Sequence, residues 1–97
     1  MIFSVSSQLY EEVLARLTDK IDARNYFSGS FSFEYEEVVC RMVVSCFGYR
    51  RPVVMPEGAK SAIVDLVPVW WEFHTTDSAG ERLNDFSFSE LRRLLHA

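Results

Sequence analysis

The sequence lacks the short motifs by which many enzymes are recognised. It contains no nucleophile motif, phosphate-binding loop, dinucleotide fingerprint or zinc-ligand pattern, and its four glycines stand singly. It also has no internal repeat, no linker and no low-complexity tract. Catalytic groups that converge from distant positions leave no such motif, so an enzyme stays an alternative. The absences nevertheless favour a protein without a catalytic centre, and we expect no bound cofactor.

Basic residues are in deficit. Ten Lys and Arg residues stand against 14 Asp and Glu residues, which gives a formal net charge of -4 at pH 7 and a pI of about 5.1. A negative chain repels phosphate groups, so we expect no nucleic-acid partner. The sequence has neither a basic leader nor an apolar run of membrane length, and so predicts no secretory signal and no membrane partner. We expect a soluble, cytoplasmic protein.

Cysteine is scarce, with Cys40 and Cys46 as the two examples. They lie six residues apart on one side of a predicted strand, which separates them by about 20 Å. A disulfide requires Cα atoms within roughly 7 Å. The spacing therefore predicts two buried, reduced thiols that neither form a disulfide nor bind one metal ion together.

Acidic residues gather at Glu34, Glu36 and Glu37, where the chain is expected to turn back. Turns commonly carry solvated acids. We therefore expect a solvated turn here, and a cation site is the alternative.

Apolar residues, by contrast, are plentiful. The chain has 97 residues, of which 48% are hydrophobic and 14% aromatic. This is enough to fill one core, so residues 1–97 are expected to form a single domain.

The chain is organised around the extended stretch Ser61 to Thr76. Alternation along a strand sends successive side chains to opposite faces, and the stripe that best fits a core is Ile63, Asp65, Val67, Val69, Trp71, Phe73 and Thr75. A straight strand of this length would run roughly 50 Å, more than twice the usual length. Pro68 cannot donate to a ladder hydrogen bond. Pro68 therefore belongs at an edge, a bulge or the start of a strand, and we predict a break or sharp bend there, with a central strand after it and a projecting ribbon before it.

Helical spacing marks both ends of the chain. Ser6 and Ser7 offer N-caps for a helix through about Arg24, whose apolar stripe fits packing on a sheet. Asn25 is expected to end this helix. A capping-box pattern from Ser87 to Glu90 predicts a last helix that begins at Phe88.

Period-two patterns fill the middle of the chain. Strands are predicted over Phe27 to Tyr35, Val38 to Arg51 and Arg82 to Phe86, in addition to the long stretch. The second of these has one apolar face and one mixed face, and the mixture predicts partial cover on that second side. The order is helix, four strands, helix. The fold class is therefore α+β, an antiparallel meander of about four strands with an N-terminal and a C-terminal helix packed on one face.

Two adjacent tryptophans give the sharpest functional signal, because Trp70 and Trp71 cannot both face one side of a strand. If Trp71 fills the core, Trp70 needs a cover or a partner. The cover could be the second helix, the N-terminal lead or Tyr49. The alternative is an interface, to which Tyr49, Arg50 and Arg51 would add residue types that are frequent in binding sites.

Glu72 and His74 follow on the stripe of Trp70. They could form an acid and base pair or two ligands of a metal ion. The plainer interpretation is a solvated strand face with a cross-strand partner.

The segments RRPVVMPEG and VPVWWEFHTTDSAGERLNDFSFSELRRLL, within Arg50 to Leu95, resemble small uncharacterised domain families of gut Bacteroidales. These families have about the length of this chain. The resemblance implies a cytoplasmic accessory protein from a mobile or phage-derived element, and it implies no activity and no site residue.

The leading hypothesis from the sequence is a non-enzymatic protein-interaction domain, whose partner is another protein or a second copy of the chain. Self-association could use an unpaired strand edge at Ile2 to Val5 or around Pro52. The alternative is a small-ligand-binding protein or enzyme with a pocket beside Trp70, Glu72 and His74.

Overall fold

The computed structural model describes residues 2–96. In chain order the elements are helix α1 (Ser7–Lys20), strands β1 (Tyr26–Tyr35), β2 (Val38–Met55), β3 (Gly58–Asp77) and β4 (Gly80–Arg82), helix α2 (Phe88–Arg93) and the 3-10 helix η1 (Leu94–His96). The strands pair in the order β1-β2-β3-β4, and each is antiparallel to its neighbours. The predicted α+β meander between two helices is confirmed.

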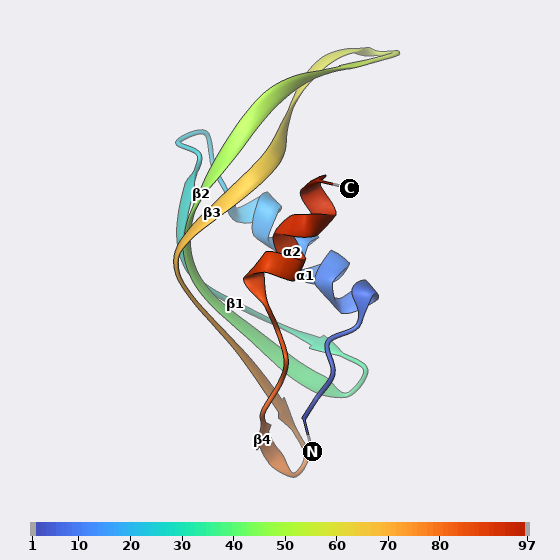
Figure 1. Ribbon diagram of the computed structural model, residues 1–97, viewed down its shortest axis with the longest axis vertical. Coiled ribbons are helices and arrows are strands. Elements are labelled where there is room, and N and C mark those ends of the chain that lie inside the picture. Colours follow the sequence, from blue (N-terminus) through green and yellow to red (C-terminus); the bar gives the residue numbers. More distant parts are fainter. Residues whose placement is uncertain (1, 97) are drawn as a thin grey trace.

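Both helices lie on one side of the sheet. Figure 1 shows them against the concave side of the curved strands, while the β2–β3 hairpin extends beyond them at the top of the view. This hairpin makes the molecule elongated, at 48 × 25 × 20 Å. We name the helix side of the sheet the inner face and the opposite side the outer face. The core lies on the inner face and consists of Leu9, Val13, Leu17, Ile21, Phe33, Val38, Cys40, Met42, Val44, Cys46, Leu66, Phe73, Phe86, Phe88 and Leu91.

Helix α1 begins as predicted and ends early. The Ser6 hydroxyl accepts a hydrogen bond from the Leu9 amide at 3.2 Å, which satisfies an amide that has no partner inside the helix. The helix ends at Lys20, four residues before the predicted end, because Ile21 has extended backbone angles and turns its side chain into the core. Asn25 does adopt the left-handed conformation, with φ 61°, but in the turn that leads to β1.

The irregularity predicted at Pro68 is a β-bulge and not a break. Strand β3 runs through it for 20 residues. Opposite Pro68 the register with β2 shifts: Ser45 pairs with Trp70 and Cys46 pairs with Pro68. Val69 is left without a partner, so it forms a β-bulge. The strand absorbs its proline and its extra residue in this bulge and continues.

The bulge also corrects the predicted core stripe. Trp71, Phe73 and Thr75 lie opposite inner-face residues of β2, as expected. From Asp65 to Pro68 the alternation is reversed, since one extra residue exchanges the two faces of a strand. Leu66, from the other stripe, is therefore fully buried at 0% exposure, whereas Val69 is 65% exposed. A second register shift, with Tyr49 opposite Asp65 and Arg50 opposite Ile63, restores the predicted alternation at Ile63.

The strand predicted over Arg82 to Phe86 is wrong in its bounds. Strand β4 is the short segment Gly80–Arg82, and Asn84 beyond it forms a parallel bridge with Phe3. The N-terminal lead, named from the sequence as an unpaired edge, is thus paired at Phe3. Helix α2 begins at Phe88 as predicted, but the Ser87 side chain makes no capping hydrogen bond.

The two cysteines are free and buried, as expected. Desolvation by burial raises the pKa of each thiol to about 11. Both are therefore protonated at neutral pH and poorly nucleophilic.

Candidate functional site

The outer face of the sheet is open. All helices of residues 2–96 lie on the inner face (Figure 1), so the partial cover predicted for the second side of β2 is absent from this part of the chain. Alternation and register assign the following residues to the outer face: Tyr26, Ser28, Ser30, Ser32 and Glu34 of β1; Val39, Arg41, Val43, Ser45, Phe47 and Tyr49 of β2; Trp70, Glu72, His74 and Thr76 of β3.

Four aromatic residues form what we name the aromatic patch: Tyr26, Phe47, Tyr49 and Trp70. The rings of Tyr26 and Phe47, which pair across β1 and β2, have centroids 4.8 Å apart. Tyr49 follows Phe47 on the same stripe of β2. Trp70 lies opposite Ser45, one pleat from Phe47. The patch thus runs obliquely over three strands.

Trp70 is 58% exposed, and Tyr49 is 55% exposed. The second helix, the N-terminal lead and Tyr49 were the possible covers of Trp70, and none of them shields its ring from solvent. Water in contact with a large apolar ring is unfavourable, by about 25 cal/mol for each Å² that a partner could cover. Trp70 is therefore available as a contact residue.

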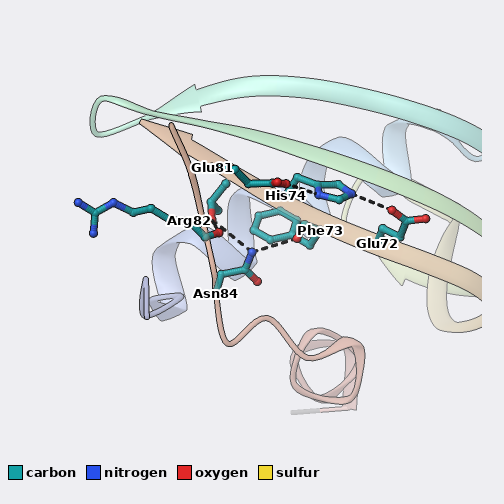
Figure 2. A network of polar contacts seen from close by, with 7 residues as sticks. Glu72, Phe73, His74, Glu81, Arg82 and Asn84 are labelled. Atoms are coloured by element: carbon teal, nitrogen blue, oxygen red, sulfur yellow. Dashed lines mark hydrogen bonds and ion pairs between the residues drawn. The ribbon is translucent and has the colours of Figure 1, made fainter. Parts of the chain in front are cut away.

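Glu72 and His74 meet a third residue, Glu81 of β4. The Nε2 atom of His74 lies 2.8 Å from Glu72 Oε1, and its Nδ1 atom lies 2.8 Å from Glu81 Oε1. Figure 2 shows the ring between the two carboxylates. The hydrogen bond to Glu72, followed by that to Glu81, raises the pKa of His74 above its ordinary value, because both bonds favour the charged imidazolium.

We name the contacts of His74 with Glu72 and Glu81 the histidine clamp. They suit a structural role better than catalysis. Both ring nitrogens of His74 are engaged, so neither is free to accept or donate a proton to a substrate. The two carboxylates lie on opposite sides of the ring and cannot hold one metal ion with it. Across the described residues there is no group of three or more His, Cys, Asp or Glu side chains suited to a metal ion, the acidic turn of β1 and β2 included.

The two arginines named from the sequence, Arg50 and Arg51, lie in different parts of the structure. Arg50 faces the helices, where its guanidinium donates to Asn25 Oδ1 at 2.7 Å and to the Ile21 carbonyl at 3.0 Å. It thereby ties the end of α1 to β2. Arg51 lies opposite Ala62 on the exposed β2–β3 hairpin, beyond Tyr49 and away from Trp70. Of the six candidate interaction residues, Arg50 alone is turned to the inner face.

The surface hollows do not coincide with the predicted ligand pocket of Trp70, Glu72 and His74. One of about 450 Å³ reaches His74 and is otherwise lined by Trp71, Phe73, Glu81, Arg82, Leu83, Asn84 and Phe86. Another, of about 820 Å³, lies between α1, η1 and the base of the hairpin. Neither includes Trp70 or Glu72. The three residues of the predicted ligand pocket therefore share no hollow among these.

Three residues of the aromatic patch and of the His74 contacts were not among the candidates from the sequence. Tyr26 and Phe47 complete the aromatic patch, and Glu81 completes the histidine clamp. Phe47 belongs to the mixed stripe of β2, so the alternation of that strand already placed its ring on the same side as Tyr49. Glu81 carries no such signal, because its contact with His74 depends on the β3–β4 hairpin.

Comparison with protein-family models, curated proteins and solved structures gave no match. The resemblance to domains of gut Bacteroidales is therefore untested and stays a prediction. None of the helices described in residues 2–96 has the length and the apolar run that a membrane crossing takes.

Proposed function

We propose that the chain is a non-enzymatic protein-interaction domain that binds a partner protein through the outer face of its sheet. The observation that carries the proposal is the exposed aromatic patch with Trp70 at its end. Tryptophan and tyrosine are frequent anchors of protein interfaces, because each covers a large apolar area with few rotatable bonds.

The surroundings of the patch support the same function. Small hydroxyl side chains lie beside it on β1, and the Ser28 and Ser45 hydroxyls form a hydrogen bond of 2.7 Å. The charged groups Arg41, Glu72 and Glu81 lie farther along the outer face. A binding surface typically has an apolar centre and a polar rim, and these groups supply such a rim on one side of the patch.

The proposed partner is a protein that offers an apolar surface. The chain has a net charge of -4, so a polyanion would meet net repulsion. The buried, protonated thiols of Cys40 and Cys46 agree with a cytoplasmic role, where cysteines stay reduced.

Affinity purification from the native host tests the proposal when three baits are compared. These are the unaltered chain, Trp70→Ser and Val54→Ser. Val54 is a matched control because it is also apolar and 87% exposed, but lies on the hairpin away from the patch. We expect the unaltered chain and Val54→Ser to recover the same protein, and Trp70→Ser to recover at least about tenfold less, as loss of an anchor residue does.

Equal recovery of that protein by all three baits would show that the outer face does not bind it. Circular dichroism of the three baits serves as the folding control, since each substitution lies at an exposed position.

The alternative, a ligand-binding or catalytic pocket, has less support. Trp70 and Glu72 lie on the open outer face, and the ring nitrogens of His74 are both occupied. The hollow that reaches His74 is lined by other residues.

A further inference from the structure

Strand β1 is the edge strand of the sheet, and its free edge is unprotected. It has ten residues, YFSGSFSFEY, with one charged side chain and no proline. Its register with β2 is continuous from Tyr26 to Tyr35, without a bulge. Edge strands normally avoid pairing with other chains through prolines, lysines, bulges or a covering segment. Within residues 2–96, β1 has none of these devices on its open side.

The other edges of the sheet do have them. Strand β4 has three residues, and Phe3 pairs beyond it with Asn84. The open part of β3 carries Pro68 and the bulge at Val69. The part of β2 that extends past β1 carries Pro52 between charged and apolar residues. The contrast sets β1 apart as the edge that is open to another strand.

The pairing of β1 with β2 determines which of its backbone groups are free. The Gly48 amide donates to the Asn25 carbonyl at 2.8 Å, and bonded pairs alternate along an antiparallel ladder. Odd-numbered residues from Phe27 to Tyr35 therefore bond to β2. The two-residue turn of Glu36 and Glu37, with φ 48° and 68°, agrees, since such turns close on a bonded pair. The amides and carbonyls directed to the free edge are those of Tyr26, Ser28, Ser30, Ser32 and Glu34.

We propose that β1 pairs with β1 of a second copy of the chain, antiparallel and about a two-fold axis at Ser30, to form one continuous eight-stranded sheet. This goes beyond the proposed function, because it uses the free backbone edge of β1 and not the aromatic patch of the outer face. The axis at Ser30 is the register in which all five outward-directed residues bond to one another, with up to about ten hydrogen bonds. Of the two edges named from the sequence, Phe3 in the N-terminal lead is paired with Asn84, and the stretch of β2 around Pro52 is open on one side; β1 is a further open edge.

Side chains on both faces suit this pairing. On the outer face Ser28 meets Ser32 of the second copy, and the one charged residue, Glu34, meets Tyr26 rather than itself. On the inner face Phe27 and Phe31 are half-buried at the edge, so a second strand would cover their rings. Pairing thus adds apolar burial to the backbone hydrogen bonds.

The flank of α1 above β1 carries an ion pair. Arg16 lies 4.5 Å over the ring of Phe33 in β1, and its guanidinium bonds to Glu12 at 2.8 Å. This ion pair is neutral in sum, and Lys20 follows Arg16 one helical turn on.

Sedimentation equilibrium from micromolar to millimolar concentration tests the proposal on the unaltered chain, Ser30→Pro and Ser30→Thr. Proline at position 30 removes an amide that β2 does not use, so the fold can keep its ladder. It also removes both central bonds of the dimer. We expect the unaltered chain and Ser30→Thr to dimerise, and Ser30→Pro to dissociate at least about tenfold more readily.

A second substitution keeps the test decisive if Ser30→Pro fails to fold. Ser30→Lys places two like charges opposite each other at the axis, whereas Ser78→Lys adds the same charge in the exposed β3–β4 turn. We expect Ser30→Lys to be monomeric and Ser78→Lys to dimerise. A monomeric unaltered chain at millimolar concentration, or dimers of equal stability in Ser30→Pro or Ser30→Lys, would overturn the proposal.

Amide exchange and the outer-face variant separate this inference from the proposed function. In the dimer the amides of Ser28, Ser30 and Ser32 should exchange slowly at high concentration and quickly on dilution. Trp70→Ser should dimerise as the unaltered chain does. Free exchange of these amides in a dimer, or loss of the dimer in Trp70→Ser, would refute edge pairing and assign self-association to the outer face, leaving the proposed function in place.

Discussion

Trp70 and Trp71 are neighbours in the chain, yet they lie in opposite environments. Trp71 packs on the core, with its ring centroid 5.4 Å from that of Phe86 and 6.3 Å from that of Phe88. Trp70 points the other way and is 58% exposed. The first contributes to the stability of the fold, and the second adds little to it. Residue type alone therefore says nothing about role in this sheet, whereas the face on which a residue lies does.

The same division holds along the central strands. Phe73 and Met42 pair on the inner face and are buried, while Glu72 and Val43 pair on the outer face and meet solvent. The helices provide apolar partners for the inner face alone. The outer face has its own apolar side chains without such partners, and this imbalance is the basis of the proposed binding surface.

The largest expected effect on stability comes from a deletion that turns inner-face residues of a strand to the outer face. Deletion of Val43 in β2 shifts half of the middle strand against both neighbours and turns core residues outward, so we expect the chain to lose its cooperative fold. Deletion of Val69 is the matched control. It removes the bulge residue and leaves Trp70 opposite Ser45 and Pro68 opposite Cys46, so we expect a folded protein that is less stable by about 1–3 kcal/mol.

Thermal unfolding followed by circular dichroism distinguishes the two deletions. A cooperative transition for the Val43 deletion, or none for the Val69 deletion, would show that the bulge does not set the two faces of β3.

The second-largest expected effect is the difference in stability between variants of Trp71 and Trp70. Trp71→Ala removes a ring that packs on Phe86 and Phe88, and should lower the free energy of unfolding by about 3 kcal/mol. Trp70→Ala removes a ring from an exposed position and should lower it by less than about 1 kcal/mol. Urea unfolding followed by circular dichroism measures both. Similar losses would mean that the outer face is as tightly packed as the inner one.

The smallest effect concerns the charge state of His74. The hydrogen bonds to Glu72 and then to Glu81 raise its pKa in the folded state, while Arg41 lies opposite it on β2. A raised pKa stabilises the fold below the pKa of the unfolded state, and this stabilisation is lost as pH rises through the folded-state pKa. The contribution is small, because the His74 side chain is 35% exposed.

Histidine titration by nuclear magnetic resonance gives the direct measurement. Glu72→Gln should lower the pKa of His74 more than Glu81→Gln does. An unaltered His74 that titrates at or below the ordinary histidine value would disprove the clamp between the two carboxylates.

Much of the fold could be predicted from the sequence, because local patterns specify it. The Ser6 cap, the alternation of β1 and the turn glycines at Gly58 and Gly80 all act within a few residues. Pro68 indicated a bulge as one of three possibilities, but the residue that is left unpaired, Val69, depends on how β2 and β3 pair. The reversed stripe from Asp65 to Pro68 follows from this bulge and from the second register shift opposite Tyr49 and Arg50.

The site was predicted in part. Adjacent tryptophans on a strand must face opposite ways, so Trp70 could be found without a structure. The neighbours that give it context come from other strands: Tyr26 from β1 and Phe47 from β2. Arg50 was assigned to the surface because its partners, Asn25 and the Ile21 carbonyl, lie 25 or more residues away.

Acrylamide quenching of single-tryptophan variants tests the central claim, that the outer face is uncovered while the inner face is packed. Trp71→Phe leaves Trp70 as the reporter, and Trp70→Phe leaves Trp71. We expect Trp70 to be quenched nearly as strongly as in the urea-unfolded chain, at low and high protein concentration alike, and Trp71 to be quenched much less. Equal protection of the two tryptophans would contradict the account, because it would mean that a segment or a partner already covers the outer face.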